Sequence, residues 1–219
     1  DLAADTISTA SKQALAPNVL LENAAIKHSQ WMIATDTISH TGAGGSTPYQ
    51  RAVAEGYKPG WVGENIAWRG TTGPMVLESY IDIQHRDLFL SSGHRSNMMS
   101  ATYREIGIAQ ETGIVRMNGV DYRSSMVTEV FGAAGTARFV TGVAYSDLDA
   151  NSFYSMGEGL GGVSLAAGGR STTTGAAGGY ALSVDSANAT KALDLSGVVG
   201  RLAFSIKLNM TVGNVKLDI

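Results

Sequence analysis

The sequence contains no cysteine and only four prolines in 219 residues. Without cysteine the chain has no disulfide, no thiol nucleophile and no thiolate ligand for a metal. Charged residues make up only 16% of the chain and the formal net charge is −3, so there is no electrostatic basis for binding nucleic acid or an anionic membrane. No apolar run approaches the roughly 20 residues that a transmembrane helix needs.

What is present is typical of a globular protein. Hydrophobic residues make up 44% of the chain, and its length suits one large domain or two smaller ones. The chain begins DLAADTIS, without an initiator methionine and without a signal peptide. We therefore expect a mature or trimmed product, and export has to be argued from the domains.

The first part of the chain has the signals of helices followed by antiparallel strands. Asn18 is placed to cap a helix over roughly 19–35. Thr47, Pro48 and Gln50 form the capping-box pattern of a second, short helix. Gly73-Pro74 is expected to open a third helix, and Asn118-Gly119 marks a hairpin between two later strands. We therefore predict an α+β domain, an α–β–α sandwich.

Near residue 136 the composition changes. From 138 onward we expect no helix, because short apolar runs alternate with glycine, serine, threonine and asparagine. That spacing predicts a small all-β sandwich at the C-terminal end. The predicted domains are therefore residues 1–136 and 137–219.

Three residues of the first domain are candidates for chemistry: His40, Glu64 and His94. Each lies next to glycine or in an expected loop, and KPGWVGEN (58–65) is the predicted loop that carries Glu64. Two imidazoles and a carboxylate are what a zinc-like divalent cation accepts, with positions left open for water. The same trio could act as acid and base without a metal, and scattered loop residues are the alternative to both.

Several stretches of the first domain resemble the CAP superfamily, also called the SCP or pathogenesis-related-1 fold, in its short bacterial form. They are LLENAAIKHSQWMIATDTISHTG, GSTPYQRAVAEGY, VGENIAW, SGHRSNMMSATYREIGIA and VTEVFG, in that order along 18–132. The resemblance implies an α–β–α sandwich with a large cleft. Many members place two histidines and two acidic residues there, and some bind zinc or another divalent ion.

By this resemblance His40 and His94 match the two histidines, and Glu64 matches the acidic residue of the GEN motif. The second acidic residue lies on the helix before the second histidine in eukaryotic members. Here that helix is VLESYIDIQHRDLFL, and our alignment selects Asp82. Glu78 and His85 lie on the same helix and could substitute. Glu129, in VTEVFG, could also face the cleft, although a structural role is typical of that position.

In the second domain the stretch DLDANSFYSMGE (147–158) has the oxygen-ligand spacing of a calcium loop. Position 6, which is usually glycine, is Ser152, and no flanking helix is apparent. The alternative is a polar turn in which acids happen to alternate. The predicted calcium ligands stand at loop positions 1, 3, 5, 7 and 12: Asp147, Asp149, Asn151, Phe153 and Glu158.

The same region resembles bacterial β-sandwich modules of the SdrD B-like, Cna B-like and carboxypeptidase-regulatory-like type. The stretches that carry the likeness are GVAYSDLDANSFYSMGEGLGGVSL and STTTGAAGGYALSV. The resemblance implies an extracellular spacer or adhesion module whose loop is stiffened by calcium.

Three functions remain open from the sequence. The first is a secreted bacterial binding module with a cleft that holds a small-molecule, lipid or protein ligand, or a zinc-like divalent cation. The second is a metal-assisted hydrolase, a protease or esterase, using His40, Glu64, His94 and Asp82. The third is a structural or adhesive surface protein with a vestigial cleft, in contact with a cell surface or matrix. All three predict an extracellular location, no nucleic acid and no transmembrane segment.

Overall fold

The computed structural model describes residues 12–185, 188, 191–211 and 213–219. The chain divides into two compact units, which are described separately below. Among the described residues the first unit comprises Lys12 and Asn18–Ala134, and the second comprises Gln13–Pro17 and Gly135–Ile219. The division thus falls two residues before the predicted boundary at 136, and the first eleven residues of the predicted first domain lie outside the described part.

The first unit is built on three long antiparallel strands in the order β3-β4-β2. They are β2 (Trp61–Thr71), β3 (Glu105–Met117) and β4 (Val120–Ala133). The expected hairpin at Asn118-Gly119 is confirmed, because both residues adopt the positive φ that such a turn requires, 51° and 80°. Strand β4 lies between the other two, and its residues from Ser124 to Ala133 are all buried.

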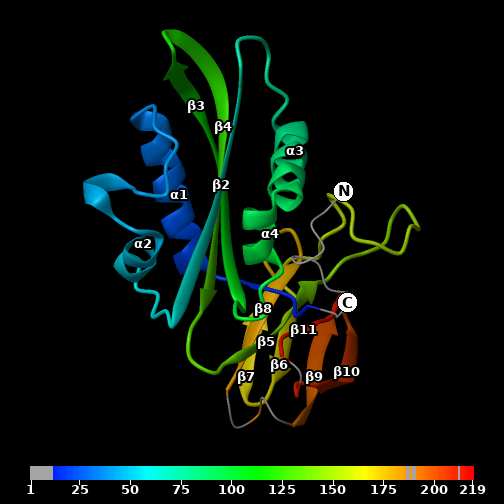
Figure 1. Cartoon of the computed structure of the whole chain (residues 1–219). Coiled ribbons are helices and arrows are strands. Elements are labelled where there is room, and N and C mark those ends of the chain that lie inside the picture. The colour runs from blue at the N-terminus through cyan, green and yellow to red at the C-terminus, as the bar shows by residue number, and fades with distance from the viewer. Residues whose placement is uncertain (1–11, 186–187, 189–190, 212) are drawn as a thin grey trace. The chain divides into compact units, whose positions relative to one another are not determined.

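Helices cover both faces of this sheet (Figure 1). The helices α1 (Val19–Ala34) and α2 (Pro48–Ala54), with the short 3-10 turn η2 (Ala43–Gly45), lie on one face. The helices α3 (Leu77–Leu90) and α4 (Ser92–Met98) lie on the other. Consecutive residues of β4 therefore contact different helices. Thr128 shares a 2.7 Å hydrogen bond with Ser29 of α1, and Glu129 pairs with His85 of α3.

The predicted caps of the first two helices are confirmed. The Asn18 side chain accepts hydrogen bonds from the backbone N–H groups of Leu20 and Leu21. Thr47 and Gln50 form the reciprocal capping box, with Pro48 as the first helical residue. These helices start where they do because the side chains satisfy N–H groups that have no partner within the helix.

Two expectations for the first unit are wrong. The segment from Trp61 to Glu64 is strand, not loop, because β2 pairs with β4 along its whole length, from Trp61 opposite Ala133 to Thr71 opposite Arg123. The third helix starts at Leu77 rather than at Pro74, with Val76 as a cap residue whose side chain makes no capping bond. Gly60 and Gly63 on either side of Trp61 and Val62 made this segment resemble a loop, and the strand is only partly buried.

Helix α1 approaches the sheet most closely at Gly107 of β3. A Cβ atom at Gly107 would lie 2.0 Å from the backbone nitrogen of Glu22. The apolar core of this region joins residues of α1, α2 and the sheet, and Tyr57 closes it: Leu21, Ala25, Ala52, Tyr57, Ala109 and Val130. With no cysteine in the chain, this packing holds the unit together without a disulfide.

The described residues of the second unit contain strands and no helix. One sheet has the order β10-β9-β6-β7, and the other has the order β11-β5-β8. Their bounds are β5 (Arg138–Val143), β6 (Ser164–Ala167), β7 (Arg170–Thr173), β8 (Gly179–Val184), β9 (Ala192–Val199), β10 (Leu202–Asn209) and β11 (Val215–Lys216). The short strand β1 (Ala16–Pro17) also falls in this unit.

The two sheets of the second unit share one apolar core. Val140 and Leu182 from one sheet and Leu165, Leu195 and Leu208 from the other belong to the same buried cluster. Alternate residues of β8 are buried, as expected when one face of a strand packs inward. This arrangement is compatible with the predicted all-β sandwich.

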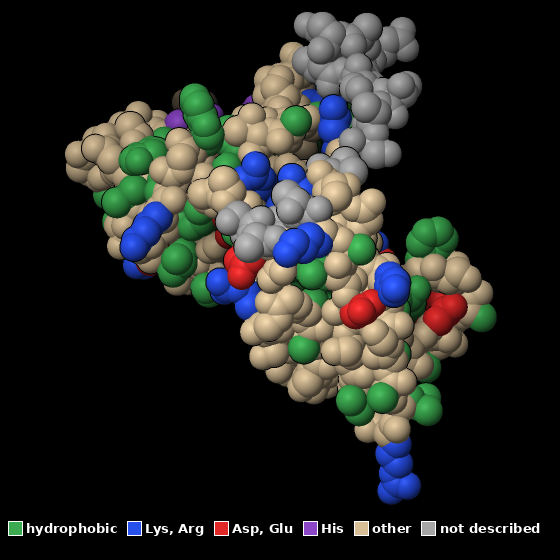
Figure 2. Space-filling model, turned by 90° about the horizontal axis from the view of Figure 1, so that it is seen from below, with side chains coloured by type: hydrophobic (Ala, Val, Ile, Leu, Met, Phe, Trp, Pro, Cys, Tyr) green, Lys and Arg blue, Asp and Glu red, His purple; other side chains and the backbone are tan. Residues whose placement is uncertain are grey.

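None of the helices in the described residues is long and apolar enough to span a membrane. On the face drawn in Figure 2, side chains of both charges are scattered over a mainly uncharged surface. That distribution agrees with the low charge content of the sequence.

Candidate functional site

Glu64 is the centre of a buried polar cluster on the α1–α2 face of the sheet. Its side chain is 1% exposed, and both carboxylate oxygens have partners. The Arg51 guanidinium donates to Oε2 at 2.5 Å, and His40 Nδ1 lies 2.8 Å from Oε1. Arg51 also donates to the backbone carbonyls of His40 and Ser46, which ties the histidine loop to helix α2. The His40 ring itself is about half exposed.

His28 lies behind this cluster and is fully buried. Its Nε2 is 2.9 Å from the carbonyl oxygen of Ser39 and 3.8 Å from Glu64 Oε1. Burial lowers the pKa of His28, although the charge of Glu64 acts in the opposite direction. The neutral ring therefore donates its Nε2–H to Ser39, and its Nδ1 has no partner among the described residues. These contacts give His28 a structural role between helix α1 and the loop that carries Ser39.

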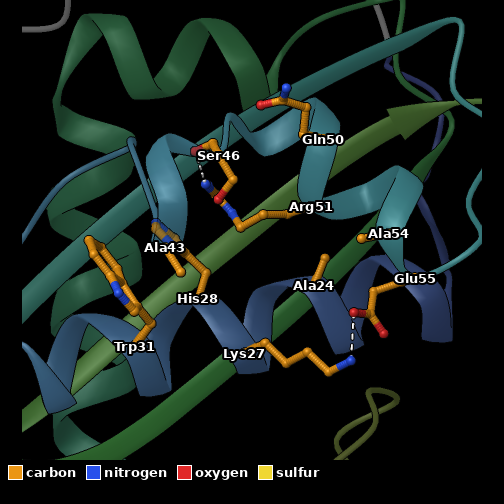
Figure 3. A pocket seen from close by; sticks show the side chains of 10 residues that line it. All are labelled: Ala24, Lys27, His28, Trp31, Ala43, Ser46, Gln50, Arg51, Ala54 and Glu55. Carbon is orange, nitrogen blue, oxygen red and sulfur yellow. Dashed lines mark hydrogen bonds and ion pairs between the residues drawn. The ribbon is translucent and has the colours of Figure 1, made fainter.

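A hollow of about 240 Å³ lies next to His28, between α1 and α2 (Figure 3). Trp31 stacks on the His28 ring with the ring centres 5.7 Å apart, and the Lys27–Glu55 ion pair closes one end at 2.6 Å. Lys27 and Glu55 pair with each other, Arg51 binds Glu64, and Nδ1 of His28 is the one fully buried side-chain N or O atom without a partner in the described residues. This hollow is separate from the predicted trio.

The next residue of β2, Asn65, points to the opposite face of the sheet. It lies directly across from Glu129 of β4, and its amide donates to Glu129 Oε2 at 2.9 Å. The other oxygen of Glu129 is 3.0 Å from Nδ1 of His85 on α3. Glu129 is therefore a second buried carboxylate that holds an exposed histidine, since the His85 ring is 61% exposed.

His94 belongs to this second face. Its Nδ1 is 2.8 Å from Ser91 Oγ, and its backbone carbonyl accepts a hydrogen bond from Asn65. Partial burial lowers the pKa of His94, the charge of His40 adds to this effect, and Glu129 opposes it. Through its carbonyl, His94 is linked to Asn65 and so to the Glu129–His85 cluster, whereas Glu64 and His40 form the other cluster. Asn97, which donates to Asn65 Oδ1 and to the carbonyl of Glu64, connects them across β2.

A hollow of about 200 Å³ opens beside His94, between α3 and β2. Ser91 and His94 line it together with Trp68, Arg69 and Asp87. A carboxylate, a guanidinium and an indole around one small space provide an acceptor, a donor and an apolar surface. Arg95, in contrast, is buried and donates to the carbonyls of Phe89 and Leu90, so it fixes the junction of α3 and α4.

The predicted trio is thus divided between the two faces of the sheet. His40 and Glu64 are joined on one face, and His94 lies on the other. The candidates for the fourth residue of the predicted cleft also occupy different places. Asp82 is exposed on α3, about 200° around the helix from the buried Gln84, whereas His85 reaches Glu129. The structure does not bring Asp82 to the other three residues.

The donor set does not form a ready zinc-like centre. Each oxygen of Glu64 already accepts from one side chain, Arg51 or His40, and keeps one further lone pair. Within the described residues, the only group of three metal-ligating side chains whose ligand atoms lie within 4.8 Å of one another is in the second unit. A cation bound by His40, His94 and Glu64 would require these side chains to move, and that site stays a prediction.

The group in the second unit is the predicted calcium loop. Asp147, Asp149 and Glu158 each offer an oxygen within 4.8 Å of the others. Glu158, which is buried, accepts hydrogen bonds from the backbone N–H groups of Leu148 and Asp149 on one oxygen and Ser155 on the other. The three carboxylates therefore point inward.

Ser152, at the position where calcium loops usually have glycine, has a φ of 64°. The loop therefore makes the left-handed turn expected there without the residue that makes it easiest. Asn151 Nδ2 donates to Asp149 Oδ2 and to Ser155 Oγ, and its Oδ1 accepts from the N–H of Phe153. Phe153 stands at loop position 7, where the ligand is a backbone carbonyl, and its side chain is 74% exposed.

Sequence reasoning missed Arg51 and Asn65 and left Glu129 and His85 undecided. Arg51 was hidden because it lies on a short helix with ordinary surface composition. Asn65 and Glu129 become a pair only once β2 is known to be a strand and its register with β4 is fixed. The adjacent Glu-Asn in β2 was the available signal, since neighbouring strand residues face opposite sides of a sheet.

Residues 8–113, just under half of the chain, match the model of the CAP family, described as the cysteine-rich secretory protein family. This chain has no cysteine. No curated protein matches it. The match covers both histidines and Glu64, and it ends before Glu129.

Two solved structures are similar at low identity. One is an extracellular protein with an SCP domain from Bacillus anthracis, 21% identical, with a TM-score of 0.42 over 56% of this chain and 35% of the other. The second is an outer surface protein from Borrelia burgdorferi, 18% identical, with a TM-score of 0.41 over 57% of this chain and 80% of the other. This chain therefore spans about a third of the length of the Bacillus anthracis protein.

Proposed function

We propose, taking the CAP match of residues 8–113 as premise, that this is an extracellular binding protein whose first unit holds a small ligand beside His94. The hollow between α3 and β2 carries this proposal, because it is bordered by His94, Ser91, Arg69 and Asp87. Its volume of about 200 Å³ is below the roughly 300 Å³ of pockets that enclose drug-sized ligands. It therefore suits one side chain or one ring of a larger molecule.

Binding is favoured over metal-assisted hydrolysis because, in the described residues of the first unit, no three metal-ligating side chains bring ligand atoms within 4.8 Å of one another. Glu64 and Glu129 each contact two neighbouring side chains, one of which is a histidine ring held at Nδ1. A carboxylate in such a position orients an imidazole and leaves Nε2 available to a ligand. His40 and His85, which these carboxylates orient, and His94, which contacts Ser91, would then serve as hydrogen-bonding groups for the ligand.

The four histidines allow a direct test. Their ring protons are assigned in proton NMR spectra with single His→Asn variants, and a panel of short peptides, acyl esters and sugars is titrated into the protein. We expect ligands to shift the His94 signal strongly and the buried His28 signal little, with no turnover. Hydrolysis of any panel member that His94→Ala abolishes would refute the binding proposal.

One contact favours a second candidate, a hydrolase that needs no metal. Ser91 Oγ lies 2.8 Å from His94 Nδ1, within the reach that a nucleophile and its base require, and both line the hollow. Burial and His40 lower the pKa of His94, which keeps the imidazole able to accept a proton near pH 7. In this case Ser91→Ala and His94→Ala both abolish ester cleavage, whereas His85→Ala does not.

For the second unit we propose a calcium-stiffened module of the type that the sequence resembles. Support comes from the three inward carboxylates and from the left-handed Ser152. Calcium at a hundredfold excess over its Kd would stabilise this unit by about 2.7 kcal/mol.

The calcium proposal is tested by calorimetric titration of the full chain. Asp149→Asn should abolish calcium binding, and the matched control Asp194→Asn, an exposed position on β9, should leave it intact. Equal calcium affinity in the two variants would show that the loop is an ordinary polar turn.

A further inference from the structure

The calcium loop carries three of the four large apolar side chains that are more than 70% exposed in the described residues. Leu148 is 75% exposed, Phe153 is 74% and Met156 is 85%, and Tyr154 beside them is 37% exposed. Only one other large apolar side chain in the described residues exceeds 70% exposure, Leu202 on β10. Isolated apolar residues are normal on protein surfaces, but four within nine residues are not.

The structure of the loop explains why these side chains point outward. The carboxylates of Asp147 and Glu158 turn inward and accept hydrogen bonds from loop N–H groups, including those of Leu148 and Ser152. Asn151 Oδ1 holds the N–H of Phe153. Polar groups therefore fill the inside of the loop, and apolar groups form its outer surface. This is the reverse of an ordinary surface turn.

The size of the surface argues against a protein partner. The four side chains together expose about 500 Å², if a large side chain has roughly 150–250 Å² of surface. A stable protein interface buries about 800 Å² on each partner, so the surface falls short even if all four side chains face one way. A lipid bilayer needs no matching shape, and separate apolar side chains on a projecting loop can enter its interfacial layer.

The charges of the loop add a condition. Residues 147–158 include three carboxylates and no lysine or arginine. The loop alone is therefore repelled by acidic headgroups, whereas a bound calcium ion would cancel most of this charge and could accept a lipid phosphate oxygen as a further ligand.

We propose that Leu148, Phe153 and Met156 insert into the headgroup region of a phospholipid bilayer when the loop holds calcium. The proposal rests on the calcium-binding function proposed above for its dependence on calcium. It assigns the second unit a lipid-surface contact, in addition to a role as a spacer.

The experiment is co-sedimentation of the full chain with vesicles of phosphatidylcholine and phosphatidylserine, with calcium and with chelator. Calcium binding is measured separately by calorimetry without vesicles. We expect sedimentation with calcium and little without it. Phe153→Ser should weaken partitioning about tenfold, and the triple variant Leu148→Ser, Phe153→Ser, Met156→Ser should abolish it while calcium affinity is unchanged.

Leu202→Ser is the matched control, since Leu202 is equally exposed in the same unit but lies outside the loop. It should sediment like the unaltered chain. If the chain binds calcium but does not sediment with vesicles, the lipid proposal is overturned and the calcium proposal stands. If the chain does not bind calcium, the calcium proposal is overturned. If the triple variant sediments as well as the unaltered chain, insertion of these side chains is refuted. If calcium instead makes the unaltered chain self-associate and the triple variant does not, the partner is a second copy of the chain and the lipid proposal is wrong.

Discussion

Replacing Arg51 by methionine should destabilise the first unit more than any change to an exposed ion pair. The Arg51 and Glu64 side chains are 11% and 1% exposed, and their nearest atoms are 2.5 Å apart. Methionine retains most of the aliphatic stem but leaves Glu64 as a buried carboxylate with His40 as its hydrogen-bonding partner. Removing one member of a buried pair costs about 3–5 kcal/mol, and the remaining contact with His40 favours the lower end, about 3 kcal/mol.

The second variant that makes this prediction specific is Glu64→Gln. In the double variant Arg51→Met, Glu64→Gln no charge is left unpaired, so the double variant should be more stable than Arg51→Met alone. The control is Arg86→Met. Arg86 is 67% exposed and lies 3.8 Å from Asp87, so its loss should change the free energy of unfolding by less than about 1 kcal/mol.

Tryptophan fluorescence during urea unfolding is a suitable assay, because all three tryptophans, Trp31, Trp61 and Trp68, belong to the first unit. The signal therefore reports this unit even if the second unfolds separately. The reasoning is refuted if Arg51→Met costs no more than Arg86→Met. It also fails if adding Glu64→Gln to Arg51→Met recovers no stability.

Two further predictions concern the contacts of helix α1. The pKa of His28 lies below its usual 6.5, so the unfolded chain binds more protons in mildly acidic solution, and the first unit should lose stability as the pH falls through 6.5. His28→Gln, which retains a donor for Ser39, should reduce the difference in unfolding free energy between pH 7.5 and pH 5.5, measured by urea titration. An unchanged difference would assign the pH dependence to other groups such as His94, whose pKa is also lowered. Gly107→Ala should lower the free energy of unfolding by about 3 kcal/mol or more, because the new methyl group would meet the backbone of α1 at 2.0 Å; a variant as stable as the original would show that α1 can move away at little cost.

The helix caps and the hairpin could be predicted from sequence because each depends on a few adjacent residues. Asn18, the Thr47–Gln50 box and Asn118-Gly119 determine local hydrogen bonds, whatever the rest of the chain does. Strand β2 escaped prediction for the opposite reason. Its pairing with β4 is formed by residues more than fifty positions away, and its glycines resemble those of a loop.

The candidate site shows the same limit. His40, Glu64 and His94 were chosen because they lie next to glycine or in expected loops and because they match family motifs, and neither observation tells which face of the sheet each residue occupies. For a residue of β2, the face is set by whether its position in the strand is even or odd. Glu64 and Asn65 are consecutive, so one serves His40 and the other serves Glu129. The division of the site into two carboxylate–histidine clusters follows from this alternation.

Strand β4 makes both the core contact and the site from neighbouring positions, with Thr128 against α1 and Glu129 against α3. A deletion or insertion of one residue before this pair would exchange their faces. The carboxylate would then be pressed against α1, and the hydroxyl would replace it beside His85. Point substitutions can alter the polar groups around Glu129 one at a time, but a change of length within β4 would remove the His85 contact and the α1 contact together. Evolutionary variation in length should therefore be confined to the hairpin end of this strand.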